Sequence, residues 1–172
     1  SGETRSCINI LDPGYGSTEY LEPGFTVSPE EEQEFMDRFP DIIRDSDVVT
    51  ISGSLPRGII KDIYSKMITI AWEMGKKVLL DSSGETLKKA IAAGPTLVKP
   101  NQDEIQQLAE AKITSEEDLI RCGKKVHEMG VAYVVISQGK EGALLICEEG
   151  VFKGHSPKIK AVNAVGCGDS ML

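Results

Sequence analysis

The residues best suited to chemistry lie near the end of the printed sequence, in the run Gly166-Cys167-Gly168-Asp169. The run follows an apolar segment and precedes Ser170, which predicts that a helix begins there. Two glycines at a helix N-terminus expose backbone N–H groups to an anion, and an adjacent carboxylate can accept a proton from an attacking hydroxyl. The pattern fits phosphoryl transfer. From this motif alone, a glycine turn with Asp169 in the first helical turn is the simpler interpretation.

Other polar residues follow a series of short apolar runs, which predict strands alternating with amphipathic helices. Nearly continuous apolar strands suit a parallel sheet covered on both faces, with a ligand crevice at the carboxyl ends of the strands. We expect four strand ends to line one edge of that sheet. The strands are 48–52, 78–81, 96–99 and 132–137, the helical stretches are 59–74, 85–93 and 102–129, and the polar ends are Ser52-Gly53-Ser54, Asp81-Ser82-Ser83, Lys99-Pro100-Asn101 and Ser137-Gln138-Gly139.

The two ends of the chain differ from this α/β pattern. Residues 4–11 and 17–21 predict a β-hairpin around turn residues 12–16. Ser28 and Pro29 predict a helix start, with the helix running to about Arg44. Short strands joined by Gly and Pro turns predict an antiparallel edge; they are 142–147, 151–153 and 159–162. We therefore divide the chain into a β segment, 1–27, and an α/β body, 28–172.

Composition excludes several classes of protein. The 172 residues carry 19 Lys+Arg and 27 Asp+Glu, a net charge of -8, so nucleic acid and anionic membranes are not expected partners. The apolar runs are too short to cross a bilayer and no signal peptide is evident, which favours a cytosolic setting. Cysteines and histidines lack zinc-ligand spacing. Trp72, with Ile68, is expected to pack in the core.

Five segments in the same order resemble motifs of the pfkB-type carbohydrate kinases of the ribokinase-like superfamily. They are similar to the start of the family's substrate lid, its phosphosugar-kinase loop, its K-P-N-x-x-E motif, its nucleotide loop S-x-G-x-x-G and its C-terminal G-x-G-D. The segments here are Gly2-Glu3-Thr4-Arg5, 51–58, 99–104, 137–142 and 166–169. The resemblance implies a three-layer α/β/α fold with a mostly parallel sheet and a small β lid at the N-terminus.

The resemblance also implies which residues bind the phosphate already on the sugar and which act at the reacting hydroxyl. Arg5 resembles the lid arginine that grips a phosphate already on the sugar, and Ser54 with Gly53 resembles the second part of that pocket. From the residues alone, Arg5 could equally be an exposed strand arginine, and 53–54 a simple turn. Asp169 resembles the catalytic base, and the segment Gly166, Cys167 and Gly168 resembles the anion hole.

A second group of residues resembles the nucleotide and magnesium site. Asn101 and Glu104 look like the residues that organise Mg²⁺, through water, with the nucleotide phosphates. The same pair could instead form a helix-capping box, and both roles can coexist. The resemblance assigns nucleotide contacts to Lys99, Asn101, Ser137, Gly139 and Gly142.

Together these roles imply ATP-dependent phosphorylation of a ketohexose monophosphate, fructose 1-phosphate or tagatose 6-phosphate, with Mg²⁺ as cofactor. The alternative is a non-catalytic sensor of nucleotide or sugar phosphate with the same fold. An exposed lid edge predicts a homodimer formed through the lid.

The sequence departs from the family pattern in three ways. Cys167 replaces the usual small alanine or serine, and Asn163-Ala164 replaces a frequent Asp-Thr, which weakens any inference of a monovalent-cation site. Family members also begin earlier, with a segment that carries a sugar-contacting aspartate, and continue through helices that wall the adenine. We therefore expect this chain to be the central part of a longer kinase.

Overall fold

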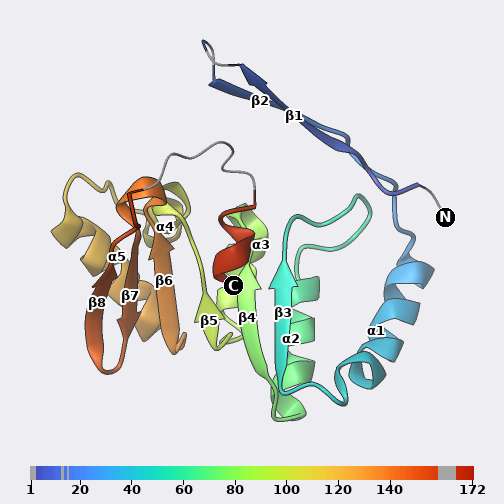
Figure 1. The fold of residues 1–172 in the computed structure, drawn as a ribbon. Coiled ribbons are helices and arrows are strands. Elements are labelled where there is room, and N and C mark those ends of the chain that lie inside the picture. Colours follow the sequence, from blue (N-terminus) through green and yellow to red (C-terminus); the bar gives the residue numbers. More distant parts are fainter. Residues whose placement is uncertain (1–2, 13, 15, 159–165) are drawn as a thin grey trace.

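The computed structural model describes residues 3–12, 14, 16–158 and 166–172. Within them a two-stranded antiparallel hairpin, β1 (Cys7–Asp12) and β2 (Gly16–Leu21), extends away from a larger α/β body (Figure 1). The register pairs Cys7 with Leu21 and Asp12 with Gly16. The hairpin predicted around residues 12–16 is confirmed.

The body is built on one sheet whose described strands follow the order β3-β4-β5-β6-β7-β8. Strands β3 to β6 are parallel, and β7 and β8 add an antiparallel edge. This arrangement confirms both the parallel sheet and the antiparallel edge predicted from the sequence. The strands are β3 (Val48–Ser52), β4 (Lys77–Asp81), β5 (Leu97–Val98), β6 (Tyr133–Ser137), β7 (Ala143–Cys147) and β8 (Gly150–Gly154). The strand predicted over 159–162 lies outside the described residues.

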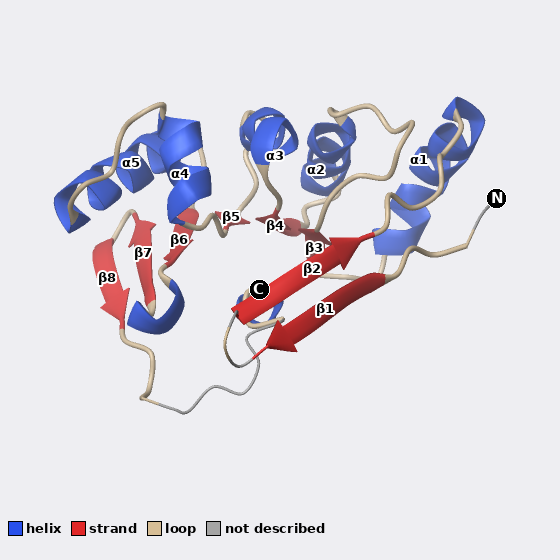
Figure 2. Cartoon of the chain, turned by 90° about the horizontal axis from the view of Figure 1, so that it is seen from above, coloured by secondary structure: helices blue, strands red, loops and turns tan. Residues whose placement is uncertain are grey.

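The described α-helices all lie on the same side of the sheet (Figure 2). They are α1 (Pro29–Ile43), α2 (Ile63–Glu73), α3 (Gly84–Ile91), α4 (Gln102–Ala109) and α5 (Glu116–Glu128). The second helical layer of the expected fold is not among the described residues. None of the helices in the described part of the chain has the length and apolar composition that crossing a bilayer requires.

The helix starts follow from local chemistry. At α1, the Ser28 hydroxyl accepts a hydrogen bond from Glu31 N, the Glu31 carboxylate accepts one from Ser28 N, and Pro29 occupies the first helical position. The stretch 102–129, expected as one helical region, contains two helices. They are separated because Glu110 adopts a left-handed conformation with φ of 51° and Ser115 caps the next helix.

The core lies between the helices and one face of the sheet. Side chains alternate along β4, where Val78 and Leu80 are fully buried beneath the helices while Leu79 faces the other side. The core position expected for Trp72 is wrong, since this residue is 55% exposed. Its neighbour Ala71 and Ile68 face the core, whereas Trp72 lies at the edge of α2, where its Nε1 donates to the Gly94 carbonyl at 2.7 Å.

Candidate active site

The hairpin arginine meets the loop that follows β3. Arg5 Nη2 donates a hydrogen bond to Ser54 Oγ at 3.1 Å, although the two residues are 49 positions apart in the sequence. The chain between them is fixed to the same loop, because Val27 N donates to the Arg57 carbonyl at 2.8 Å. The structure thus brings together the two side chains expected to hold a substrate phosphate. Their binding role stays a prediction.

A buried ion pair joins the carboxyl ends of β4 and β5. Lys99 is 6% exposed, and its Nζ lies 3.0 Å from Asp81 Oδ2. The same Nζ lies 3.6 Å from the position that a Cβ on Gly168 would occupy. The lysine therefore places positive charge directly beside the C-terminal glycine motif. Figure 1 shows the C-terminal segment on the side of the sheet away from α2 and α3.

Asp81 belongs to one of the polar strand ends predicted to line this edge, but no individual role was predicted for it. The signal that could have identified it was present, because a carboxylate directly follows the apolar residues of a strand at the edge where a parallel sheet binds ligands. The Asp81 carboxylate supplies the counter-charge for Lys99, because a buried lysine without one would strongly destabilise the fold.

Asn101 and Glu104 form the capping box at the start of α4. Asn101 Oδ1 accepts a hydrogen bond from Glu104 N at 2.9 Å, and Glu104 Oε2 accepts one from Asn101 N at 2.8 Å. Burial raises the pKa of the Glu104 carboxyl, and the charge of Asp81 raises it further, while the Asn101 N–H bond and Lys99 oppose that shift. The capping interpretation is confirmed, and any metal role must coexist with it.

The described residues include no group of three His, Cys, Asp or Glu side chains placed to hold a metal ion directly. The negative charge of Asp81 is one of the causes that raise the pKa of the Glu104 carboxyl. Two carboxylates at the carboxyl-end edge of a parallel sheet would fit a hydrated Mg²⁺, because this ion keeps several waters and prefers oxygen ligands.

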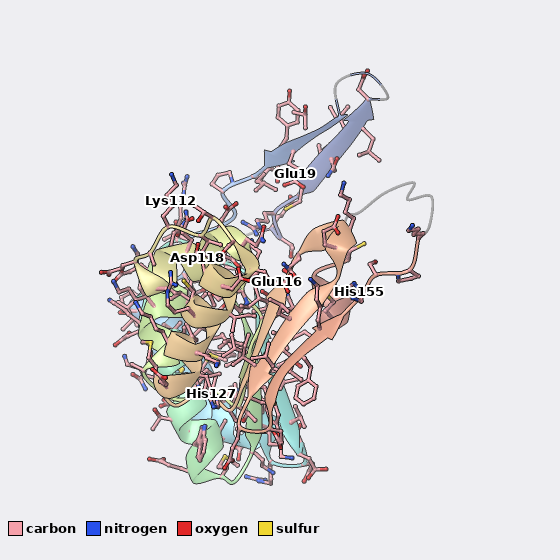
Figure 3. The ribbon with its side chains drawn as sticks, turned by 90° about the vertical axis from the view of Figure 1, so that its left-hand side faces the viewer. Glu19, Lys112, Glu116, Asp118, His127 and His155 are labelled. Carbon is pink, nitrogen blue, oxygen red and sulfur yellow. The ribbon has the colours of Figure 1, made fainter. Side chains whose placement is uncertain are left out.

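His127 lies away from this edge, whereas His155 directly follows β8, which ends at the edge because Gly154 pairs with Ala143 and Ala143 pairs with Ser137. Figure 3 shows His127 on α5 and His155 after β8, well separated from each other. His127 Nδ1 lies 2.7 Å from the Val131 carbonyl, a structural contact at the opposite end of the helix from Glu116 and Asp118. An ion pair between Glu116 and Lys153 joins α5 to β8.

The loop after β6 adjoins the start of α4. Ser137 N donates to the Pro100 carbonyl at 3.0 Å, and Ser137 pairs with Asn101 in an isolated bridge. Gly139 borders open space, since a Cβ added to this residue would meet no atom within 4 Å. Such an open backbone position is compatible with the approach of a nucleotide phosphate.

Gly142, expected to contact nucleotide, has a packing reason to be glycine. Its φ is +103°, and an added Cβ would lie 1.9 Å from the Gly154 carbonyl oxygen on β8. The residue lets the loop close against the sheet edge, where Gln138 N donates to the Gly142 carbonyl at 2.9 Å. This packing accounts for a glycine at the position, and the predicted nucleotide contact of Gly142 stays a prediction.

We expect Gly142→Ala to lower the free energy of unfolding by roughly 2–5 kcal/mol, because a strained backbone conformation adds to a severe steric overlap. Gly75→Ala is the matched control: its φ is +70°, but a Cβ there meets no atom within 4 Å. That variant should lose only about 1 kcal/mol. Urea unfolding of both variants measures the difference, and equal losses would show that the contact with Gly154 is unimportant.

The C-terminal motif forms a tight turn. Residues 166–168 lead into the three-residue 3₁₀ helix Asp169–Met171, so a helical segment begins where the sequence predicted one. Ser170 N donates to the Gly166 carbonyl at 3.1 Å, and Met171 N donates to the Gly168 carbonyl at 3.1 Å. Asn163-Ala164 and the side chain of Asp169 lie outside what the structure describes, so the cation-site inference and the base role stay predictions.

These observations define a class of protein. One edge of the sheet, at the carboxyl ends of the parallel strands, holds three loops, a buried lysine and a glycine turn. This edge is where α/β proteins bind phosphorylated ligands. The family model for the pfkB family carbohydrate kinases matches residues 1–172. The chain belongs to the pfkB family of carbohydrate kinases.

Curated relatives agree with this membership. The chain is 38% identical over 174 residues to a tagatose-6-phosphate kinase of Staphylococcus epidermidis, with 99% of this chain and 56% of that protein covered. It is 37% identical over 171 residues to a 1-phosphofructokinase of Bacillus subtilis, with 99% and 55% covered. The chain thus spans about half the length of these relatives.

A solved structure shows the same fold. Phosphofructokinase-2 from Escherichia coli in complex with potassium matches with a TM-score of 0.89 and 31% identity, over 99% of this chain and 56% of that chain. This similarity confirms the ribokinase-like arrangement of a mostly parallel sheet with an N-terminal antiparallel hairpin.

Proposed function

We propose that the protein containing this chain transfers a phosphoryl group from ATP to a ketohexose monophosphate, fructose 1-phosphate or tagatose 6-phosphate, and yields the bisphosphate. The contact between Arg5 and Ser54 carries this proposal. It places a guanidinium and a hydroxyl on the edge of the sheet that also holds Lys99 and the C-terminal glycines. A planar guanidinium suits a phosphate, and a free sugar offers it no anionic partner. The names of the two curated relatives support the same substrate class.

In the proposed reaction, a hydroxyl of the sugar phosphate attacks the γ-phosphorus of ATP. Asp169 accepts the hydroxyl proton, the new P–O bond forms, and the bond between the γ-phosphorus and the bridging oxygen breaks to release ADP. Backbone N–H groups of 166–168 stabilise the charge on the transferring group. Lys99, with its Nζ next to Gly168, adds a positive charge at the same place.

ATP is proposed to lie along the loops after β5 and β6, near Asn101, Ser137 and Gly139. Mg²⁺, when bound, neutralises charge on the ATP phosphates. Glu104 and Asp81 would hold its hydrated form, with Asn101 fixing the orientation of Glu104 through the capping box. Assaying the full-length protein for ATP-dependent phosphorylation of a panel of sugar phosphates tests the proposal. Binding of both ligands without turnover would favour the sensor alternative.

We expect Glu104→Gln to raise the Mg²⁺ concentration needed for half-maximal rate by about 10-fold, a typical effect of losing a residue that orients a metal's water shell. The carboxyl binds the ion only when ionised, and its pKa is raised by burial. Mg²⁺ affinity of the unaltered protein should therefore fall as the pH drops toward that raised pKa, whereas Glu104→Gln should show a weaker pH dependence. Titrating Mg²⁺ at neutral and mildly acidic pH measures both effects.

Glu128→Gln, at the exposed end of α5, is the control for that experiment. It should leave the Mg²⁺ requirement and its pH dependence unchanged. If Glu104→Gln also leaves the Mg²⁺ requirement unchanged, Glu104 has only its capping role.

We also propose that residues 1–27 form a separate lid unit and that two lids pair in a homodimer. Ile8, Ile10 and Tyr20 are 52–60% exposed. They share one face of the hairpin, because Ile8 pairs with Tyr20 and residue 10 lies two positions along the same strand. An apolar hairpin face of this kind is a typical association surface.

Sedimentation of the full-length protein should show a dimer, and Ile10→Glu should shift it to monomer because it places a charge in the apolar face. Glu19→Gln, on the opposite face, should remain dimeric. A monomer at all working concentrations of the unaltered protein would contradict lid pairing. A tetrameric inhibited form is known for phosphofructokinase-2 from Escherichia coli, so the assembly size itself needs this measurement.

A further inference from the structure

A set of hydrogen bonds fixes the backbone at Gly53, next to the proposed phosphate-binding serine. Tyr64 OH donates to the Gly53 carbonyl at 3.3 Å, and Ser82 Oγ donates to the same oxygen at 3.5 Å. Gly53 N donates to the Asp81 carbonyl at 2.9 Å. Both sides of this residue are therefore held by the body of the protein, from α2 and from the end of β4.

This fixation matters because Gly53 is otherwise free to rotate. Its φ is +97°, a region that glycine enters without steric cost, and a Cβ there would meet no atom within 4 Å. Neither the chain's own stereochemistry nor packing against the residue holds this conformation. The hydrogen bonds to its carbonyl and from its N–H supply the restraint.

The direction of the Gly53 carbonyl determines where the next residue points. A trans peptide is planar, so the C=O of Gly53 and the N–H of Ser54 point in opposite directions. The described chain contains no cis peptide bond. With the carbonyl turned toward Tyr64, the Ser54 N–H is aimed away from the protein body, while Ser54 Oγ lies 3.1 Å from Arg5.

Tyr64 is suited to act as a permanent donor in this arrangement. It lies in the first turn of α2 and is buried, at 8% exposure. Burial also raises the pKa of its phenol above the ordinary value of 10.0, so the hydroxyl keeps its proton throughout the neutral range.

We infer that Tyr64 is a positioning residue for the sugar phosphate: through the Gly53 carbonyl it orients the N–H and hydroxyl of Ser54 as a pair of donors toward the phosphate that Arg5 binds. The inference rests on the proposed function, since it assigns Tyr64 to the phosphate pocket of that reaction. Tyr64 itself touches no substrate.

The test is Tyr64→Phe in the full-length protein, which removes one oxygen and keeps the buried ring. The KM for the preferred sugar phosphate should rise about 3- to 10-fold, the range for losing one neutral hydrogen bond of this length. The KM for ATP should stay within about twofold, because the nucleotide loops lie on other strands. Tyr133→Phe removes the same atom from a 40% exposed tyrosine at the far end of β6 and should change neither constant.

Two further measurements separate positioning from a general loss of stability. In an Arg5→Ala background, Tyr64→Phe should have a smaller effect on the sugar-phosphate KM, because the two residues serve one phosphate. Hydrogen exchange of residues 53–58 should be faster in Tyr64→Phe, with residues 97–101 unchanged.

The outcomes distinguish the inference from the proposed function. If the unaltered protein phosphorylates sugar phosphates and Tyr64→Phe leaves their KM unchanged, or raises both KM values equally, the inference is wrong and the function stands. If the unaltered protein phosphorylates none of them, the proposed function fails, and the role of Tyr64 fails with it.

Discussion

Asp169→Asn in the full-length protein is expected to lower kcat by roughly 10²-fold or more, because a positioned general base typically contributes 10²–10⁴ in rate. The substitution keeps the size of the side chain and removes its capacity to accept the substrate proton. ATP binding should be nearly unaffected, since the glycines proposed to form the anion hole and Lys99 remain in place. Steady-state kinetics, combined with calorimetric titration of ATP, measure the two effects separately.

Asp45→Asn provides the control for that variant, because Asp45 is exposed in the turn after α1. It should retain the full kcat. If Asp169→Asn also keeps most of its turnover, Asp169 has no part in proton transfer, and the catalytic role of the C-terminal motif is reduced to anion binding.

Arg5→Ala should raise the KM for the sugar phosphate by roughly 10- to 100-fold, because a charge-assisted hydrogen bond to phosphate contributes on the order of 1.5–3 kcal/mol. The KM for ATP should change little. Arg5→Lys should recover only part of the loss, since an ammonium lacks the planar pair of donors. Initial-rate kinetics with each substrate varied in turn give both constants.

Arg38→Ala is the matched control, because Arg38 is an exposed arginine on α1 that pairs across one helical turn with Glu34. It should leave both KM values unchanged. If Arg5→Ala also leaves the sugar-phosphate KM unchanged, Arg5 does not bind the substrate and is an ordinary hairpin residue that contacts Ser54.

Much of the fold could be predicted because its signals are local. The hairpin around residues 12–16, the start of α1 at Ser28 and the apolar strands each depend on neighbouring residues alone. The break between α4 and α5 was missed because no Gly or Pro marks it. Glu110, which adopts the left-handed conformation there, is not a residue that usually signals a helix end.

The Trp72 error has a different cause. A large apolar residue in an amphipathic stretch favours the core, but its place on the helix differs by one residue from the buried positions. A shift of one residue along a helix turns a side chain from the core toward the solvent. Which side of α2 faces the core is determined by its tertiary contacts.

The candidate site was predictable as a set of motifs but not as a geometry. The sequence grouped the strand ends on one edge, and the structure does bring Arg5 to Ser54 and Lys99 to Gly168. The Asp81–Lys99 ion pair could not be foreseen, because it depends on the adjacency of β4 and β5 in the sheet. The same holds for the bond from Tyr64 to Gly53, which joins a helix to a loop. The lid boundary after residue 27 and the cytosolic setting stay predictions.

The most direct test of sugar-phosphate phosphorylation is a comparison of kcat/KM values for the full-length protein at one fixed concentration of Mg²⁺ and ATP. The substrates are fructose 1-phosphate, tagatose 6-phosphate, fructose 6-phosphate, and free fructose and ribose. We predict that fructose 1-phosphate or tagatose 6-phosphate gives the highest value, and that the free sugars lose kcat as well as affinity, because binding energy from the remote phosphate positions the reacting hydroxyl. A free sugar with the highest kcat/KM would contradict the proposal that Arg5 and Ser54 bind a substrate phosphate.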